Sequence, residues 1–277
     1  MRVTKTLGAA FFALLAFGCK QSDPEEMLGR IGDVVYFSGY TWDVKIFEQY
    51  QVGPGPNYFS GHYEDVFVDE NGYLHLRIAE HDGKWFSSEV ISQMNMGYGK
   101  YTWVVQADLE NIPENTTLGL FTWDNNTFYE EANSEIDIEI SKWGDPDEEN
   151  TLLFSVQPVN FGPYYPERTH LAETNAGELI GVTTHTFTWT DTLVVWYSYA
   201  GNTEDPEKLL ATWSFDLDNP ARVKNENGNS SLPIIIPAPG ATTNARMNYW
   251  LLPWISSVPT DGLEQEVIIQ KFSYTAY

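Results

Sequence analysis

Apolar and polar residues alternate along much of the chain, and this alternation predicts β-strands. Residues 66–68 and 74–78 form two short alternating runs around Asn71-Gly72, a dipeptide typical of a tight turn between antiparallel strands. Longer alternating runs cover residues 101–109, 193–199 and 268–274. No segment of about 12 residues or more has a 3.6-residue apolar period, so we expect little helix.

The same pattern favours one all-β domain. The sequence has no internal repeat and no change of composition that would separate two domains. The Pro- and Gly-rich stretches 53–56 and 233–240 are short enough to be loops. Many short strands separated by turns favour an antiparallel sandwich or jelly roll. We therefore expect a single β-sandwich domain over residues 33–277.

Segment 134–140, Ser-Glu-Ile-Asp-Ile-Glu-Ile, differs from the other predicted strands. Alternation places three isoleucines on one face and Glu135, Asp137 and Glu139 on the other. Three acids on one strand face are unusual, because like charges repel and strands are depleted in Asp and Glu. The Cα atoms of Glu135 and Glu139 would lie ~13 Å apart at the usual rise per residue. Two Glu side chains that lean together can then approach the ~5–5.5 Å carboxyl separation of retaining glycosidases.

The acidic segment by itself leaves three interpretations open. The carboxylates can form a catalytic pair with a helper, in which one attacks a sugar carbon and the other transfers protons. They can bind calcium, a hard cation that prefers oxygen ligands. They can also be an ordinary solvated face of an edge strand.

Composition excludes several partners. The chain has 39 Asp and Glu against 15 Lys and Arg, a net charge of −24, so neither nucleic acid nor an anionic lipid surface is an expected partner. Aromatic residues make up 15% and hydrophobic residues 42%, enough for a folded core. The only cysteine is Cys19, which excludes an internal disulfide and a cysteine-based zinc site.

The N-terminus predicts export. Two basic residues precede the apolar run 7–17, which is too short to span a bilayer comfortably, and Cys19 follows it. Residues 1–18 resemble a bacterial lipoprotein signal, which implies lipidation at Cys19 and a flexible tether over residues 19–32. The expected location is a bacterial outer membrane, facing the periplasm or the cell surface, with this lipid as the only membrane contact. An ordinary cleaved secretory signal is the alternative.

Several motifs together resemble family 16 glycoside hydrolases, retaining endo-β-glycanases that include lichenases, laminarinases, agarases and carrageenases. The family signature Glu-x-Asp-x-Glu matches residues 135–139. The other matching motifs, in family order, are 53–59, 70–77, 89–92, 97–101, 119–123, 185–189 and 246–250. The resemblance covers about residues 33–277. It implies a concanavalin-like β-jelly-roll sandwich of two antiparallel sheets.

The resemblance also implies roles for individual residues. Glu135 is the implied nucleophile, Asp137 its helper and Glu139 the acid/base. The implied substrate-binding residues are Asn57, Glu89 and Asn248, which match positions that hydrogen-bond sugar hydroxyls, and the aromatic Phe121, Trp123 and Trp250. Aromatic faces suit sugar rings, whose C–H groups contact π faces while the hydroxyls take polar partners.

Two residues depart from the family pattern. Asn133 replaces a frequent Trp, and Ile91 replaces a frequent Arg. Both positions lie where substrate is recognised, so they affect the choice of substrate more than the reaction. Loop 124–132 adds Glu130 and Glu131, which would repel sulfated or uronic polymers from a nearby cleft. This favours a neutral β-glucan.

The expected function is therefore hydrolysis of internal bonds in a β-1,3- or mixed-linkage β-1,3-1,4-glucan by a monomeric enzyme that requires no cofactor. The alternative is a surface lipoprotein of the same fold that binds glycans without cleaving them. Many relatives hold a structural calcium ion on the outer face of the sandwich, but no motif here locates one. The five histidines have no metal-ligand spacing and are expected to be structural or surface residues; they are His62, His75, His81, His170 and His185.

Overall fold

The computed structural model of the chain describes residues 30–127, 133–159, 168–216, 222–225, 228–231 and 235–277. The predicted signal 1–18, Cys19 and most of the tether 19–32 lie outside the described residues, as do Glu130 and Glu131. Within the described ranges, no helix is long and apolar enough to cross a membrane.

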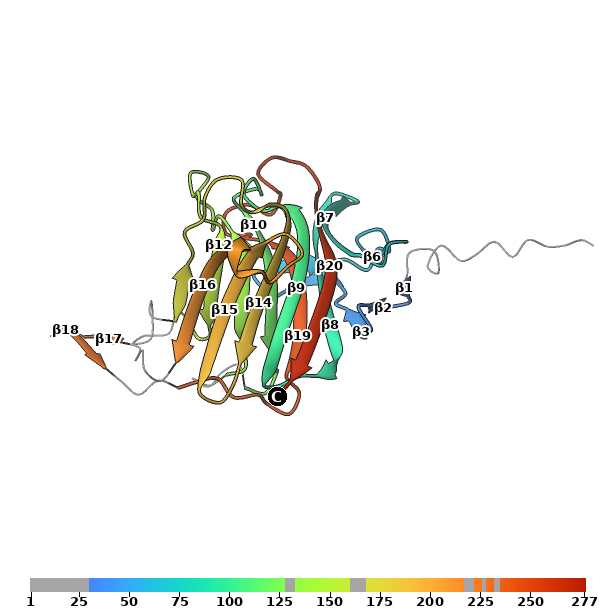
Figure 1. Cartoon of the computed structure of the whole chain (residues 1–277). Coiled ribbons are helices and arrows are strands. Elements are labelled where there is room, and N and C mark those ends of the chain that lie inside the picture. The colour runs from blue at the N-terminus through green and yellow to red at the C-terminus, as the bar shows by residue number, and fades with distance from the viewer. Residues whose placement is uncertain (1–29, 128–132, 160–167, 217–221, 226–227, 232–234) are drawn as a thin grey trace, which may run out of the picture.

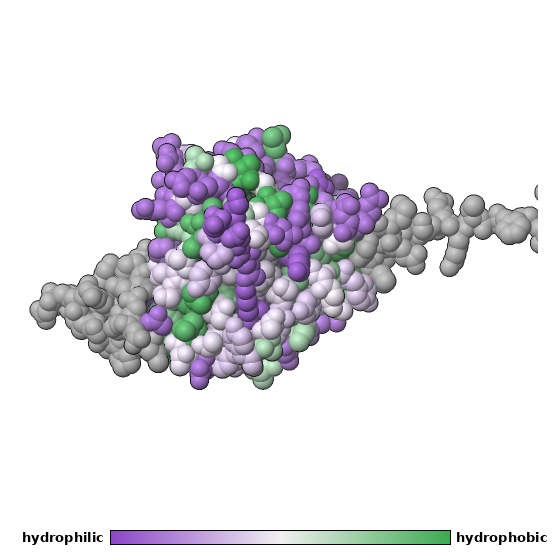
Figure 2. Space-filling view, viewed as in Figure 1, coloured by the Kyte–Doolittle hydropathy of each residue, from purple (hydrophilic) through white to green (hydrophobic). Residues whose placement is uncertain are grey.

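The described residues form the predicted all-β jelly-roll sandwich (Figure 1). The sheet in front in Figure 1, in spatial order, is β6 (Val66–Val68), β7 (Leu74–His81), β20 (Gln265–Ala276), β9 (Gly99–Asp108), β14 (Ile180–Trp189), β15 (Leu193–Ala200) and β16 (Leu209–Asp216). The predicted alternating runs are confirmed as β6, β7, β9, β15 and β20. In Figure 2 the outer face of this sheet is mainly pale, the colour of intermediate hydropathy, which is compatible with solvent.

The second sheet lies behind the first and carries the acidic strand. In spatial order it contains β1 (Arg30–Ile31), β2 (Val34–Phe37), β3 (Tyr40–Val44), β8 (Lys84–Asn95), β19 (Asn244–Leu251), β10 (Thr116–Trp123), β11 (Ile136–Ser141), β12 (Leu152–Val156) and β13 (Thr169–Leu171). A turn between β7 and β8 connects the two sheets, with Ala79 opposite Phe86.

Four further strands and one short helix complete the described structure. They are β4 (Phe47–Val52), β5 (Asn57–Phe59), β17 (Arg222–Asn225), β18 (Gly228–Ser231) and the 3₁₀ helix η2 (Pro206–Lys208). β4 pairs with β5, which runs parallel to β8 and thereby adds the β4–β5 hairpin to the edge of the second sheet. β17 and β18 pair only with each other among the described strands.

The core between the sheets fixes the orientation of β11. Its isoleucines at 136, 138 and 140 are fully buried in the core, so the acidic side chains point to the outer face of the second sheet. Trp196 of the opposite sheet donates from Nε1 to the backbone oxygen of Asp137 at 3.1 Å. Burial of each large apolar side chain stabilises the fold by about 1.5–3 kcal/mol, so the three isoleucines fix this strand firmly in the core.

Candidate active site

Glu135 lies one residue before β11. The strand begins at Ile136, but the backbone hydrogen bonding to the chain that follows β12 already includes Glu135. The backbone N–H of Gln157 donates to the backbone oxygen of Glu135 at 3.1 Å. The side-chain oxygen of Asn133 accepts a hydrogen bond from the backbone nitrogen of Glu135 at 2.9 Å. Asn133, a departure from the family pattern, thus holds the backbone of Glu135 in place.

Strand register places four residues in one row across the second sheet. Glu89 of β8 is opposite Asn248 of β19, which is opposite Gly119 of β10, which is opposite Glu139 of β11. Directly opposed residues in antiparallel strands project from the same face. Gly119 has no side chain, and the side-chain oxygen of Asn248 takes the space that a Cβ at 119 would fill.

A second row lies two residues away along each strand, on the same face. It contains Ile91, Arg246, Phe121, Asp137 and Ser155. Asp137 accepts hydrogen bonds at Oδ2 from Ser155 Oγ at 2.6 Å and from Gln157 Nε2 at 3.1 Å. Two donors on one oxygen fix the carboxyl orientation between Glu135 and Glu139.

These rows form the floor of a cleft with a volume of about 420 Å³. Eight of the nine residues predicted for catalysis or substrate binding line it: Glu89, Phe121, Trp123, Glu135, Asp137, Glu139, Asn248 and Trp250. Sequence reasoning assigned no site role to the remaining lining residues, although four of them belong to the matched motifs; they are Lys45, Phe47, Val52, Gly53, Pro54, Gly119, Asn125 and Arg246. Distant parts of the chain therefore meet around one set of carboxylates.

Asn57 is the predicted residue that does not line the cleft. It is buried, and its Nδ2 donates to the backbone oxygens of Pro54 and Leu251, both at 2.8 Å. Its Oδ1 accepts a hydrogen bond from Ser87 at 3.2 Å. The Asn57 amide therefore connects the loop at Pro54 to the end of β19.

Glu89 lines the cleft at the centre of an ion-pair network. Its carboxylate contacts Lys45 Nζ at 2.8 Å and Arg246 Nη1 at 3.3 Å, and Asn248 Nδ2 donates to it at 3.4 Å. Lys45 also donates to the backbone oxygen of Gly53 at 2.6 Å. Two cations and an amide thus hold a carboxylate that is almost fully buried.

The register explains the departure at Ile91. Arg246 is directly opposite Ile91 on the neighbouring strand, so a guanidinium still lies beside Glu89 although position 91 is apolar. The family motif around 246–250 contains Arg246, but only the pairing of β19 with β8 indicates its partner. Lys45 had no sequence signal, because its contact spans 44 positions along the chain.

The carboxyl groups differ in their electrostatic surroundings. Burial, followed by the charges of Asp137 and Glu139, raises the pKa of Glu135, while the positive charge of Arg246 opposes this rise. Burial and the charge of Asp137 raise the pKa of Glu139, with no cation among the main influences. Burial raises the pKa of Asp137 to about 6, against the lowering effect of its hydrogen bonds with Ser155 and Gln157. Arg246 thus favours the ionised form of Glu135, whereas no cation is among the main influences on Glu139.

Aromatic side chains flank these acids. Trp123 donates from Nε1 to Asn125 Oδ1 at 2.8 Å, and the Arg246 guanidinium lies 5.6 Å from its ring centre. Trp250 contacts the exposed Trp254 edge to face, with ring centres 6.1 Å apart. Both tryptophans are thus held by neighbours while they line the cleft, as a stacking surface for a flat apolar ligand face requires.

Solved structures with a similar fold include two that are described as β-glucanases. A Bacillus licheniformis β-glucanase has a TM-score of 0.55 at 17% identity, over 87% of this chain and 94% of that one. A β-1,3-1,4-glucanase (lichenase) from a mouse hindgut metagenome has a TM-score of 0.55 at 14% identity, over 87% and 96%. The likeness is one of fold. No protein-family model and no curated protein matches the sequence.

A third similar structure carries a different description. It is described as an immunostimulatory antigen and pseudo β-1,3-glucanase of Mycobacterium tuberculosis, with a TM-score of 0.58 at 14% identity over 85% of this chain and 91% of that one. The fold is therefore found in proteins described as glucanases and in one described as a pseudo-enzyme, so function must be argued from the residues of the cleft.

Proposed function

We propose that this protein is a retaining glycoside hydrolase that cleaves internal bonds of a neutral β-glucan. The observation that carries the proposal is the set of three carboxyl groups, Glu135, Asp137 and Glu139, on the floor of a cleft lined by tryptophans. A charged cluster at the bottom of an aromatic cleft suits a ligand that has apolar ring faces and a bond that needs acid catalysis.

The first step forms a covalent intermediate. A Glu135 oxygen attacks the anomeric carbon while the bond from that carbon to the leaving oxygen breaks, and Glu139 transfers its proton to this oxygen. The positive charge of Arg246 favours the ionised form that Glu135 needs for the attack. The absence of such an influence at Glu139 favours the protonated form that an acid needs.

The second step releases the product. Ester formation removes the negative charge of Glu135, which lowers the pKa of the neighbouring carboxyls and favours the ionised form of Glu139. Glu139 then takes a proton from water as the water oxygen attacks the anomeric carbon, and Glu135 leaves as a carboxylate. Two inversions retain the β configuration. Asp137 stays in place through Ser155 and Gln157 and tunes the protonation of both glutamates by its charge.

The lining of the cleft supports a neutral substrate. Glu89 already pairs with both Lys45 and Arg246, so each cation near the floor has a carboxylate partner. An anionic polymer would find three further carboxyl groups without a free positive partner in the described lining. We therefore propose a β-1,3- or mixed-linkage β-1,3-1,4-glucan as the substrate class.

Reducing-end release from laminarin and mixed-linkage glucan tests this function. Glu135→Ala and Glu139→Ala should each lower kcat by about 10²–10⁴-fold, because the covalent and proton-transfer steps depend on them. Added azide separates the two roles, since it should give an α-glycosyl azide with Glu135→Ala and a β-glycosyl azide with Glu139→Ala. The control is Glu207→Ala on the exposed η2 helix. Wild-type rates in Glu135→Ala would overturn the proposal.

Glycan capture without hydrolysis is the second candidate. It is favoured by the raised pKa of Glu135, because a protonated Glu135 cannot act as a nucleophile while the aromatic lining still binds sugar. It predicts that laminarin binds in isothermal titration calorimetry but releases no reducing ends between pH 5 and 8. Release of reducing ends by the wild-type protein at any pH in that interval eliminates the capture hypothesis.

We further propose that the protein is exported and anchored by a lipid on Cys19. The support is the N-terminal pattern alone, and Cys19 lies outside the described residues. Labelled palmitate should enter the wild-type protein in a bacterial host and not Cys19→Ser. Equal labelling of the wild-type protein and Cys19→Ser would reject the lipid anchor. Equal removal of the signal peptide from both proteins would favour an ordinary secretory signal.

A further inference from the structure

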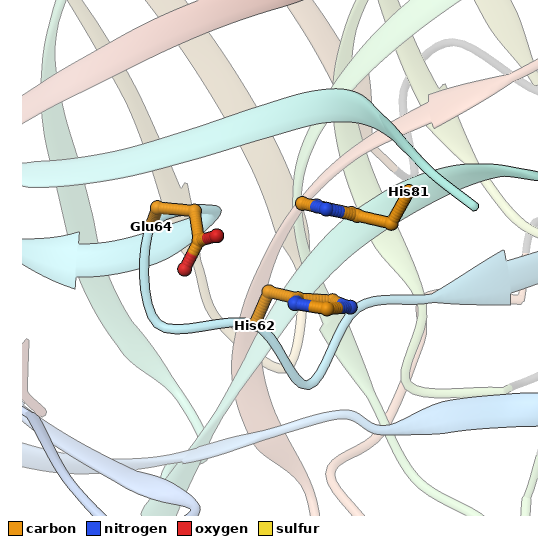
Figure 3. Close-up of side chains that lie close together, drawn as sticks. All are labelled: His62, Glu64 and His81. Carbon is orange, nitrogen blue, oxygen red and sulfur yellow. The ribbon is translucent and has the colours of Figure 1, made fainter.

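Two histidines and a glutamate converge at a place separate from the cleft. His62 and Glu64 lie between β5 and β6, and His81 is the last residue of β7. One ligand atom from each of the three side chains lies within 4.8 Å of the other two (Figure 3). None of the three lines the cleft. His62 and His81 are 19 positions apart, so their sequence spacing did not indicate a site.

A buried carboxylate orients one of these histidines. His81 Nε2 lies 2.7 Å from Oδ2 of the fully buried Asp65, which also accepts a hydrogen bond from Ser60 Oγ. Asp65 has one further close charge, Arg77 Nη1 at 3.7 Å. A carboxylate that accepts from Nε2 keeps the proton on that nitrogen and leaves the lone pair on Nδ1. This is the arrangement that supports metal-binding histidines in proteins.

The two imidazole rings are stacked. Their centres are 3.7 Å apart and their planes differ by 10° (Figure 3). A metal ion binds in the plane of an imidazole ring, so both rings can ligate one ion only after one of them tilts. We assign the tilt to His62, which belongs to the loop between β5 and β6, because the His81 ring is hydrogen-bonded to Asp65.

We propose that His62, Glu64 and His81 bind a divalent transition-metal ion of the zinc class. Two imidazoles and one carboxylate suit zinc, whereas calcium and magnesium prefer oxygen ligands alone. Three protein ligands leave a fourth position for water, in keeping with the exposed Glu64. The net charge of −24 raises the local concentration of cations around the protein.

The site would brace one wall of the cleft. The loop that carries His62 is attached to β8 through Ser60, whose backbone N–H donates to Ser87 at 3.0 Å. It is attached to β4 through Gly61, whose N–H donates to Glu48 Oε1 at 3.0 Å. β4 also contributes Phe47 and Val52 to the cleft lining. A metal that joins this loop to the end of β7 therefore stabilises the β4–β5 hairpin.

Zinc titration of the metal-free protein tests the proposal, in a Cys19→Ser background that removes the only thiol. Isothermal titration calorimetry should show one zinc ion per chain, and about a hundredfold excess over Kd should raise Tm by about 5 °C. Calcium and magnesium at equal concentration should do neither. Zinc binding should also separate the ring resonances of His62 and His81 in NMR, because the stack opens.

The variants are His62→Ala, His81→Ala and Glu64→Gln, each expected to weaken zinc binding by about tenfold or more. Glu64 is exposed, so its substitution tests the site without affecting folding. His75→Gln is the matched control, because His75 is a partly buried histidine of β7 that contacts Glu266 outside the cluster. Wild-type zinc affinity in Glu64→Gln and His62→Ala would overturn the proposal, as would calcium binding of equal strength. Glycan hydrolysis is not part of the readout, so the outcome is independent of the proposed function.

Discussion

The side chain of Asn248 occupies the space above Gly119. A Cβ built on Gly119 would overlap Oδ1 of Asn248, although both residues are in ordinary strand pairing. Within the described structure, this Oδ1 is buried without a hydrogen-bond partner. An unpaired buried acceptor is costly unless a ligand supplies a donor, which a sugar hydroxyl can do. The missing side chain at 119 thus allows Asn248 to face the same opening as Glu139.

Gly119→Ala should lower activity while the fold is kept. The added methyl group displaces the Asn248 amide, so we expect kcat/KM on laminarin to fall by about tenfold or more and the free energy of unfolding by about 1–3 kcal/mol. Initial rates and thermal unfolding measure both effects. In the double variant Gly119→Ala/Asn248→Ala the overlap is gone, so stability should recover while activity stays low. Unchanged kinetics in Gly119→Ala would contradict this account of the cleft floor.

Arg246 should set the acidic limit of activity. Its positive charge lowers the pKa of Glu135, so Arg246→Met should raise that pKa. Glu135 then becomes protonated at a higher pH, and the acidic limb of the kcat/KM profile should move to higher pH. Arg246→Lys keeps a charge and should show a smaller movement. A superimposable acidic limb in wild type and Arg246→Met would show that Arg246 does not tune Glu135.

The buried acids of the cleft floor should reduce stability at neutral pH. The pKa of Glu139 is higher in the folded protein than in the unfolded chain, so the unfolded chain loses its proton first as pH rises. Stability is therefore unaffected by this group below the unfolded pKa and falls as pH rises above it. Glu139→Gln removes the ionisation and should raise Tm at pH 7 by a few degrees, with the difference vanishing near pH 4. A lower Tm for Glu139→Gln at pH 7 would refute this linkage.

Trp250 should contribute binding more than chemistry. It lines the cleft, whereas its neighbour Trp254 is 61% exposed and does not. Trp250→Ala should raise KM for laminarin by about tenfold, equivalent to ~1.4 kcal/mol, with a smaller change in kcat. Trp250→Phe should keep most of the affinity. If Trp254→Ala raised KM as much as Trp250→Ala, the stacking surface would have been placed on the wrong residue.

Period-2 alternation was sufficient to predict β9, β15 and β20, because a strand at the surface of a core buries every second side chain. It also predicted that Glu135, Asp137 and Glu139 share a face, and eight of the nine residues indicated by the sequence line one cleft. Asn57 is the exception that does not line the cleft. Its amide donates hydrogen bonds to backbone oxygens of a loop and of a strand that is distant in sequence. A motif match identifies a residue type but not its hydrogen-bond partners.

The sequence by itself therefore determined the strand pattern and the shared face of the three acids, since both depend on residues a few positions apart. Tertiary structure alone decided that Lys45 and Arg246 neutralise Glu89, that Gly119 leaves room for Asn248, and that His62 approaches His81. These relationships depend on strand order and register, which bring together residues from separate parts of the chain. Because electrostatic effects act through space and decrease with distance, only the folded arrangement could place Arg246 where its charge opposes the pKa rise of Glu135.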